Sequence, residues 1–193
     1  MMNTGLYTSD TPEWHTPPDL FAALDAEFGF TLDPASTDEN ALCDVHYTEA
    51  DNGLTHSWAG HTVFLNPPYG RTIGHWMAKA RAEADAGATV VCLVPARTDT
   101  AWWHDYCMSG EFRFLRGRVS FTRDDGKTGR APFPSAIVIL RPEQLRQEVE
   151  RLNKENELRM MISEARPDTR FQAEGKDSAE RIDHADPGRK IGE

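Results

Sequence analysis

The chain has 193 residues and a formal net charge of −10; 39% of its residues are hydrophobic and 27% are charged. This composition predicts one globular domain with polar segments. It argues against a membrane protein, because no apolar run approaches the roughly 20 residues that span a bilayer. The three cysteines are scattered without a CxxC pair, so neither a disulfide framework nor a metal site is expected.

The first third of the chain predicts one helix and two short strands. The N-terminal residues lack the basic region and apolar core of a signal peptide, so a cytoplasmic location is expected. Thr16 is interpreted as the cap of a helix that has prolines in its first turn and ends at Gly29. Residues 30–37 then predict a strand that stops at Asp33-Pro34, and residues 44–54 predict a strand followed by a turn at Asn52-Gly53.

The middle of the chain alternates strands with helices. Residues 61–69 contain a strand, residues 71–86 a helix closed by Gly87, and residues 88–96 a continuous apolar run typical of a strand covered on both faces. A short helix follows within 98–110, then two short strands in 111–122 around Gly117 and a last buried strand at 135–140. This order predicts an α/β fold with a mostly parallel central sheet. The late strands arrive without helices between them, which predicts a terminal antiparallel hairpin.

The pattern divides the chain into three parts. Residues 1–141 are predicted to form the folded domain and residues 142–165 a C-terminal helix. The helix is indicated by a partial apolar stripe of Leu145, Val149, Leu152, Leu158 and Ile162. Residues 166–193 contain almost no apolar residues and are predicted to be disordered.

Charge is distributed unevenly along the chain. Residues 1–70 include eleven acidic and no basic residues, whereas residues 71–141 include eleven basic and seven acidic ones. The acidic part suits a cationic ligand and the basic part suits phosphates; the alternative is a lopsided, solvated surface. Six basic residues crowd into 18 positions: Arg113, Arg116, Arg118, Arg123, Lys127 and Arg130.

The stretch LNPPYG, residues 65–70, directly follows the short β-branched and apolar run of residues 61–64. Two prolines fix two φ angles and remove two backbone donors, so Asn66 and Tyr69 are held on a stiff turn. Such a turn suits methylation of an exocyclic adenine amine. The Asn66 side-chain oxygen and the Pro67 carbonyl can accept its two N–H groups, and Tyr69 offers a ring on which a flipped base can stack.

The chain resembles the phage-type DNA N6-adenine methyltransferases, the phage Dam family. The resemblance lies in EWHTPPDLF, DPAST, ENALC, ADNGL, VFLNPPYGR, LVPARTDTAWWH, RFLRGRVSF and PSAIVIL, which occur in the family's order over residues 13–140. It implies a Rossmann-like class I methyltransferase fold and transfer of a methyl group from S-adenosylmethionine to a flipped adenine in a specific DNA site. It also implies a phage or prophage origin, and hence the host cell's cytoplasm.

The resemblance assigns roles to individual residues. Thr16 and Pro17 would border the methionine part of S-adenosylmethionine, and the loop Asp33-Pro34-Ala35 would meet its amino group. Asp51 would lie near the adenosine. The catalytic turn would be Asn66, Pro67, Pro68 and Tyr69, with Asn66 also at the cofactor. The substrate would be double-stranded DNA, contacted by Arg116 and Arg118.

Several interpretations stay open at this point. Arg97 follows a buried strand and suits a salt bridge within the protein as well as a phosphate or cofactor contact. NPPY also serves methyltransferases of RNA adenine and of protein glutamine, and a catalytically inactive nucleic-acid-binding module is a further alternative. The target sequence, the oligomeric state and the biological role do not follow from these residues.

Overall fold

A computed structural model describes residues 15–122 and 128–164 of the chain. The chain divides into two compact units, Met1–Glu148 and Val149–Glu193, each of which is described by itself. The predicted disordered tail lies outside the described residues. In the described part of the chain, no helix combines the length and the apolar character that crossing a membrane requires.

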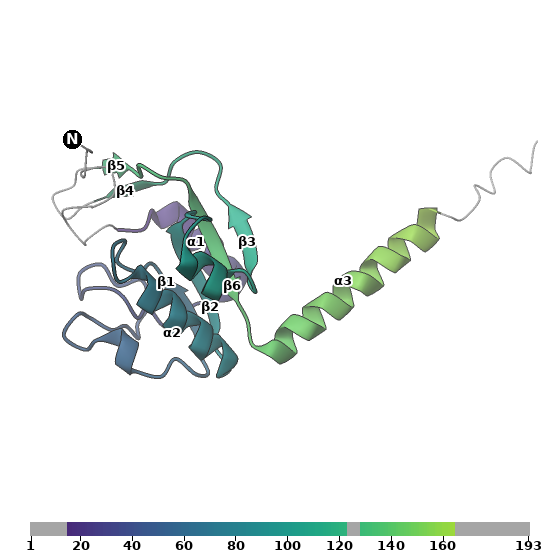
Figure 1. Ribbon diagram of the computed structural model, residues 1–193, viewed down its shortest axis with the longest axis horizontal. Helices are drawn as coiled ribbons and strands as arrows, with labels where there is room; N and C mark the ends of the chain where they lie inside the picture. Colours follow the sequence, from purple (N-terminus) through teal and green to yellow (C-terminus); the bar gives the residue numbers. More distant parts are fainter. Residues whose placement is uncertain (1–14, 123–127, 165–193) are drawn as a thin grey trace, which may run out of the picture. The chain divides into compact units, whose positions relative to one another are not determined.

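The first unit is built on a four-stranded sheet in the order β1-β2-β6-β3 (Figure 1). Its strands are β1 (Thr62–Leu65), β2 (Thr89–Pro95), β6 (Ser135–Leu140) and β3 (Glu111–Phe114). A separate two-stranded sheet contains β4 (Ser120–Thr122) and β5 (Thr128–Arg130). The described elements therefore form a mixed α/β fold.

The prediction of a mostly parallel sheet is wrong. Strands β1 and β2 pair in parallel, but β2–β6, β3–β6 and β4–β5 are antiparallel pairs. The physical reason is the connection between strands. Helix α2 (Ile73–Asp85) carries the chain back from β1 to the start of β2, which produces a parallel pair. No such helix separates β5 from β6, and β6 enters beside β2 in the opposite direction.

A hairpin is present, but it does not join the two strands predicted in 111–122, and it is not part of the main sheet. Strands β4 and β5 pair with each other, and Phe121 lies opposite Gly129. Strand β3, in contrast, joins β6 as an edge of the larger sheet. The predicted strands in 30–37 and 44–54 are reduced to isolated parallel bridges, Leu32 with Val63 and Asp33 with His46.

Helices cover both faces of the larger sheet, which explains the continuous apolar strands. Alternate strand residues such as Val63, Cys92 and Val138 pack with the α2 residues Trp76 and Met77. The intervening residues pack on the opposite face against α1 (Pro18–Phe28). Figure 1 shows α2 lying across β1 and β2. Because β2 and β6 are buried on both faces, these two strands have no polar alternation.

Two short helices complete the first unit. A 3-10 helix, η2 (Gly53–Thr55), follows Asn52, which has a positive φ of 56°. A π-helix, η3 (Trp103–Cys107), occupies the region of the predicted short helix. Trp103 is buried in the core.

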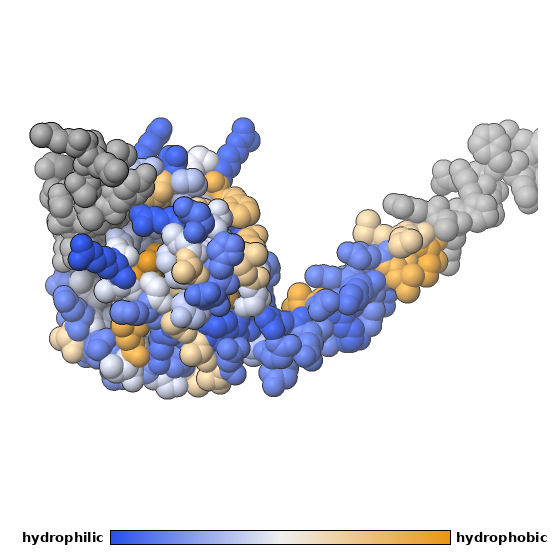
Figure 2. All heavy atoms as spheres, viewed as in Figure 1, coloured by the Kyte–Doolittle hydropathy of each residue, from blue (hydrophilic) through white to orange (hydrophobic). Residues whose placement is uncertain are grey.

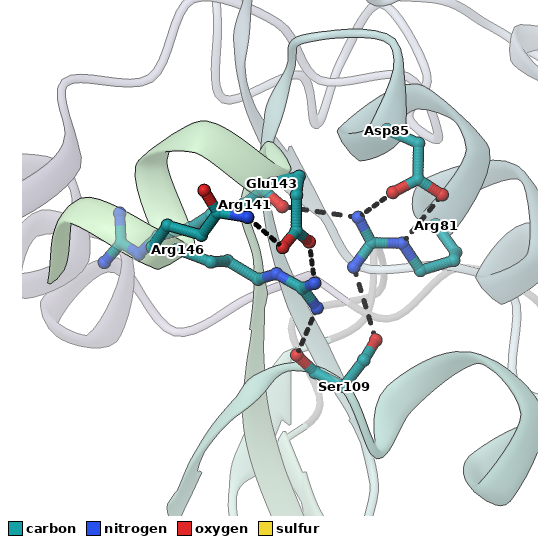
Figure 3. Close-up of polar contacts among 7 residues, drawn as sticks. Arg81, Asp85, Ser109, Arg141, Glu143 and Arg146 are labelled. Carbon is teal, nitrogen blue, oxygen red and sulfur yellow. Dashed lines mark hydrogen bonds and ion pairs between the residues drawn. The ribbon is translucent and has the colours of Figure 1, made fainter. Parts of the chain in front are cut away.

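The last helix, α3 (Glu143–Glu164), begins at a cluster of polar contacts within the first unit (Figure 3). Arg81 donates to the Asp85 carboxylate, to Ser109 Oγ and to the carbonyl of Arg141. Arg146 donates to the carbonyl of Ser109 and forms an ion pair with Glu143. These contacts hold the end of β6 and the first turn of α3 against α2.

The described part of the second unit is the remainder of α3, from Val149 onward. Its large apolar side chains are exposed, and several are visible as orange spheres in Figure 2. By helical spacing Leu158, Met161 and Ile162 lie on one side of the helix, and Leu152 lies outside that group.

Candidate active site

A cavity of about 410 Å³ opens beside the carboxyl end of β1. Its walls come from segments that are distant in sequence: His15 and Thr16, residues 33–37, residues 47–49, residues 52–54 and residues 66–69. Ligands of open α/β sheets bind at this end of the strands. The cavity therefore brings together most of the residues that the sequence assigned to cofactor and catalysis: Thr16, Asp33, Pro34, Ala35, Asn66, Pro67, Pro68 and Tyr69.

Asn66 follows the last residue of β1 and lies half-buried in the cavity wall. Its Nδ2 donates a hydrogen bond of 3.1 Å to Oγ1 of Thr16, a residue 50 positions earlier in the chain. Pro67 is buried, and neither it nor Pro68 has a backbone N–H. The turn thus presents the side-chain amide of Asn66 and the carbonyl of Pro67. The prolines add no backbone N–H that could compete for these oxygens.

The hydroxyl of Tyr69 holds the aromatic ring of the turn in place. This hydroxyl donates to the carbonyl of Leu93 in β2 at 3.1 Å. Phe121 and Phe133 meet the ring edge-on, with centroid distances of 6.0 and 5.5 Å. Burial raises the pKa of Tyr69 well above its usual range, so this phenol is a neutral donor and not a base. The ring has a fixed orientation where it lines the cavity.

Asp33 is the most buried carboxyl group of the cavity wall, with 4% of its surface exposed. It accepts backbone N–H groups from Leu42 at 3.2 Å and from Ala35 at 3.4 Å. Burial raises the pKa of Asp33 to about 6, although these two hydrogen bonds oppose the shift. Ionising a buried carboxyl group costs free energy. A cationic ligand beside Asp33 would offset this cost by stabilising the ionised form.

The loop after Asp33 approaches a second loop closely. A Cβ atom on Gly53 would lie 2.1 Å from the carbonyl oxygen of Pro34, so a glycine is required where the two loops meet. Trp58, fully buried, supports Gly53 from behind by donating its indole N–H to the Gly53 carbonyl at 3.0 Å. The Asn52-Gly53 dipeptide predicts the turn, but no local pattern predicts its contact with Pro34, which is 19 positions away in the chain.

Among the acidic residues of 47–54, the cavity is lined by Glu49 rather than Asp51. The Asp51 carboxylate accepts both the backbone N–H of Thr48 at 2.9 Å and the Thr48 hydroxyl at 2.7 Å. These bonds lower the pKa of Asp51 and use its Oδ2 to close a turn. The spacing of Thr48 and Asp51, three residues apart, was the sequence signal for such a local role.

Two further wall residues escaped the sequence analysis. Tyr47 lines the cavity and stacks on His56 with a centroid distance of 4.3 Å and an interplanar angle of 16°. The hydroxyl of Ser36 is buried in the wall and has no hydrogen-bond partner within the described part of the chain. A buried hydroxyl without a partner is rare in a folded protein and fits a site that binds a polar ligand.

Those basic residues of the 113–130 segment that the structure describes, and Arg97, do not line the cavity. Arg116, Arg118 and Arg130 are exposed around the β4–β5 hairpin. Arg113 instead forms a bidentate ion pair with Glu27, at 2.6 and 2.7 Å, so its charge is balanced within the fold. Arg97 is half-buried with its guanidinium 5.6 Å from the centre of the Phe133 ring. Arg123 and Lys127 lie outside the described residues.

The chain was compared with known proteins. Residues 3–164 match a family model described as DNA N-6-adenine-methyltransferase (Dam). A DNA N-6-adenine-methyltransferase of Escherichia phage T1 is 28% identical over 153 residues, which cover 66% of this chain and 62% of the T1 protein. The chain thus spans less than two thirds of the length of that relative. A DNA N-6-adenine-methyltransferase of Haemophilus phage HP1 is 24% identical over 149 residues, covering 74% of this chain and 86% of the HP1 protein.

Proposed function

Because the chain belongs to the DNA N-6-adenine-methyltransferase (Dam) family, we propose that it transfers a methyl group from S-adenosylmethionine to N6 of adenine in double-stranded DNA. The observation that carries the proposal is the shared cavity of Asn66 and Asp33. The Asn66 amide suits an amine substrate, and the Asp33 carboxylate suits a cationic methyl donor. We also propose that the protein acts in the cytoplasm of a bacterial host, because both relatives are phage proteins.

The residues of the cavity fit S-adenosylmethionine. The cofactor carries an ammonium and a sulfonium, and the first 70 residues, which supply most of the cavity wall, contain no Lys or Arg. Asp33 would hold the ammonium, and the buried Ser36 hydroxyl is a further polar group of the same wall. The resemblance would also place Thr16 and Pro17 beside the methionine part, although the Thr16 hydroxyl is directed to Asn66. Glu49 would accept hydrogen bonds from the ribose hydroxyl groups, and so would be the acidic residue near the adenosine in place of Asp51.

The reaction balances without another reactant. When bound, S-adenosylmethionine supplies the methyl group: the C–S bond breaks with its electron pair staying on sulfur, the N6 lone pair forms the new N–C bond, and the product amine releases one proton. The chain's own residues orient the amine. Asn66 Oδ1 and the Pro67 carbonyl accept its N–H groups, which directs the nitrogen lone pair and stabilises the positive charge that develops there.

Adenine inside a duplex cannot reach a cavity of this kind, so the base must leave the stack. The Tyr69 ring, fixed by its hydroxyl on β2, would stack with the flipped base. Arg116 and Arg118 would contact backbone phosphates beside the site, as would Arg130, which is exposed on β5. Only 14 residues separate Asp51 from Asn66, which is too few for an inserted target-recognition domain at this point. Recognition of a specific DNA sequence would therefore depend on short loops.

The test is transfer of tritiated methyl groups from S-adenosylmethionine to four substrates: double-stranded DNA, single-stranded DNA, RNA and a host protein extract. Incorporation into duplex DNA, with N6-methyladenine identified after hydrolysis, is the expected result. Incorporation into RNA or protein alone would overturn the proposal in favour of the alternatives that NPPY allows. Binding of S-adenosylmethionine without transfer to any substrate would identify an inactive binding module.

A further inference from the structure

Thr16 occupies a position that the sequence analysis interpreted as a helix cap, and this interpretation is wrong. Helix α1 begins at Pro18, its N-cap residue is Pro17, and no side chain among the described residues caps it. Thr16 is instead buried, with 7% of its surface exposed, and its Oγ1 accepts the 3.1 Å hydrogen bond from Asn66 Nδ2. The side chain is therefore directed to the catalytic turn and not to the helix.

In this hydrogen bond the Nδ2 branch of the Asn66 amide faces Thr16, and the Oδ1 branch is the one presented to a substrate. The amide group is planar and carries a donor on one branch and an acceptor on the other. With Nδ2 held by Thr16, Oδ1 points away from Thr16. The opposite orientation would direct two N–H donors at the substrate amine, which presents N–H donors itself.

The main chain of Thr16 is held from both sides. On one side, His15 donates its backbone N–H to the Thr122 carbonyl at 2.8 Å and accepts from Thr122 at 3.4 Å, which ties the segment to β4. On the other side, Pro17 and Pro18 have restricted φ angles and lead directly into α1. The Thr16 hydroxyl thus has a fixed location relative to both the β4–β5 hairpin and the β1 turn.

We propose that Thr16 is a positioning residue for methyl transfer: it orients the Asn66 amide so that Oδ1 accepts from the adenine amine. The proposal rests on the function proposed above and adds to it. The resemblance placed Thr16 beside the cofactor, and a cofactor contact would change S-adenosylmethionine affinity. A positioning role would change the rate of transfer at saturating S-adenosylmethionine and DNA, because the amide acts on the amine in the transition state.

The test compares three variants in single-turnover methylation. Thr16→Val removes the acceptor with little change of shape, Thr16→Ser keeps it, and Thr31→Val removes a hydroxyl that bonds to the 61–62 segment outside the cavity. We expect Thr16→Val to lower the saturated rate by about tenfold or more, on the scale of one lost hydrogen bond. Its S-adenosylmethionine Kd should stay within about twofold of wild type, and Thr16→Ser and Thr31→Val should retain the wild-type rate.

Two results would overturn the proposal. A weaker S-adenosylmethionine Kd with an unchanged saturated rate would make Thr16 a cofactor contact. An equal loss of rate in Thr16→Ser and Thr16→Val would make it a packing residue. Failure of wild type to methylate DNA would instead be a failure of the proposed function.

A second measurement does not depend on activity. The side-chain N–H₂ resonances of Asn66 are identified in a ¹⁵N-correlated NMR spectrum by their loss in Asn66→Ala. In Thr16→Val we expect them to shift and to exchange faster with water, while Thr31→Val leaves them unchanged. Identical Asn66 resonances in wild type and Thr16→Val would show that Thr16 does not orient this amide.

Discussion

The cavity and the β4–β5 hairpin are neighbouring regions of the first unit with opposite chemistry. The cavity is built mainly from the first 70 residues, which have eleven acidic and no basic residues, and its key carboxyl group is buried. The hairpin region has exposed arginines at positions 116, 118 and 130. The two arrangements suit the two ligands of the proposed reaction: a small cation that is enclosed and a polyanion that lies on the surface.

Burial also predicts how strongly each region responds to mutation. In the cavity, one group such as the Asn66 amide has a defined partner and little solvent, so its loss has a large effect. In the hairpin, solvent and salt screen the exposed charges, and several arginines would contact the same DNA backbone. Each arginine would therefore contribute little to the binding free energy. The following experiments test this contrast, beginning with the largest expected effect.

Asn66→Ala should lower the rate of methyl transfer by roughly 100-fold or more, because the loss of one preorganised hydrogen-bond partner costs about 3–4 kcal/mol in a transition state. The Kd for S-adenosylmethionine and the Tm should stay close to those of wild type. Single-turnover methylation with folded, cofactor-competent protein measures the effect. A near-normal rate would reduce the NPPY turn to a stiff strand exit.

Gly53→Ala should weaken S-adenosylmethionine binding and lower stability, each by about 1–3 kcal/mol. The added Cβ would lie 2.1 Å from the Pro34 carbonyl oxygen and would force apart two walls of the cavity. Isothermal titration and thermal unfolding measure the two effects. Gly60→Ala is the control, because Gly60 also lies in a loop and a Cβ there meets no atom within 4 Å, although its φ of 80° adds backbone strain. Equal loss of affinity in both variants would contradict the explanation.

The affinity for S-adenosylmethionine should rise with pH up to about 6 and then level off. The pKa of Asp33 is raised to about 6 in the cofactor-free fold, and only the ionised carboxylate attracts the ammonium. Below that pKa, affinity should fall by up to about tenfold per pH unit, and binding near pH 5.5 should release a proton. Titrations in buffers of different ionisation enthalpy detect the proton. Asp33→Asn should bind weakly with no pH dependence; a persistent dependence would assign the titration to another group.

Arg116→Ala and Arg118→Ala should each weaken DNA binding only a few-fold, equally for all sequences, and reduce the salt dependence of log Kd by about one unit. Arg113→Ala should leave that dependence unchanged, because Glu27 already balances the Arg113 charge. Fluorescence anisotropy over a series of salt concentrations measures the slopes. Equal slopes for wild type and both hairpin variants would make the basic segment a solvated surface.

The sequence by itself determined the features that depend on neighbouring residues. Helix α1 ends at Gly29 because a residue with φ of 64° is needed there, and the buried strand β2 follows from its continuous apolar run. The stiffness of the Asn66 turn follows from its two prolines. The separation of charge along the chain is likewise visible in the sequence, and the prediction of a cation site and a phosphate site rests on it.

Only the tertiary structure decided which distant residues meet. The direction of β6 depends on how the chain returns to the sheet, and no local pattern encodes it. Arg113 finds Glu27 from 86 positions away, which removes it from the basic surface, and Thr16 finds Asn66 from 50 positions away. Propensity and spacing act within a few residues, whereas these contacts arise when two segments are packed together. The local sequence therefore supplied the chemical groups of the candidate site, and the packing of the chain selected their partners.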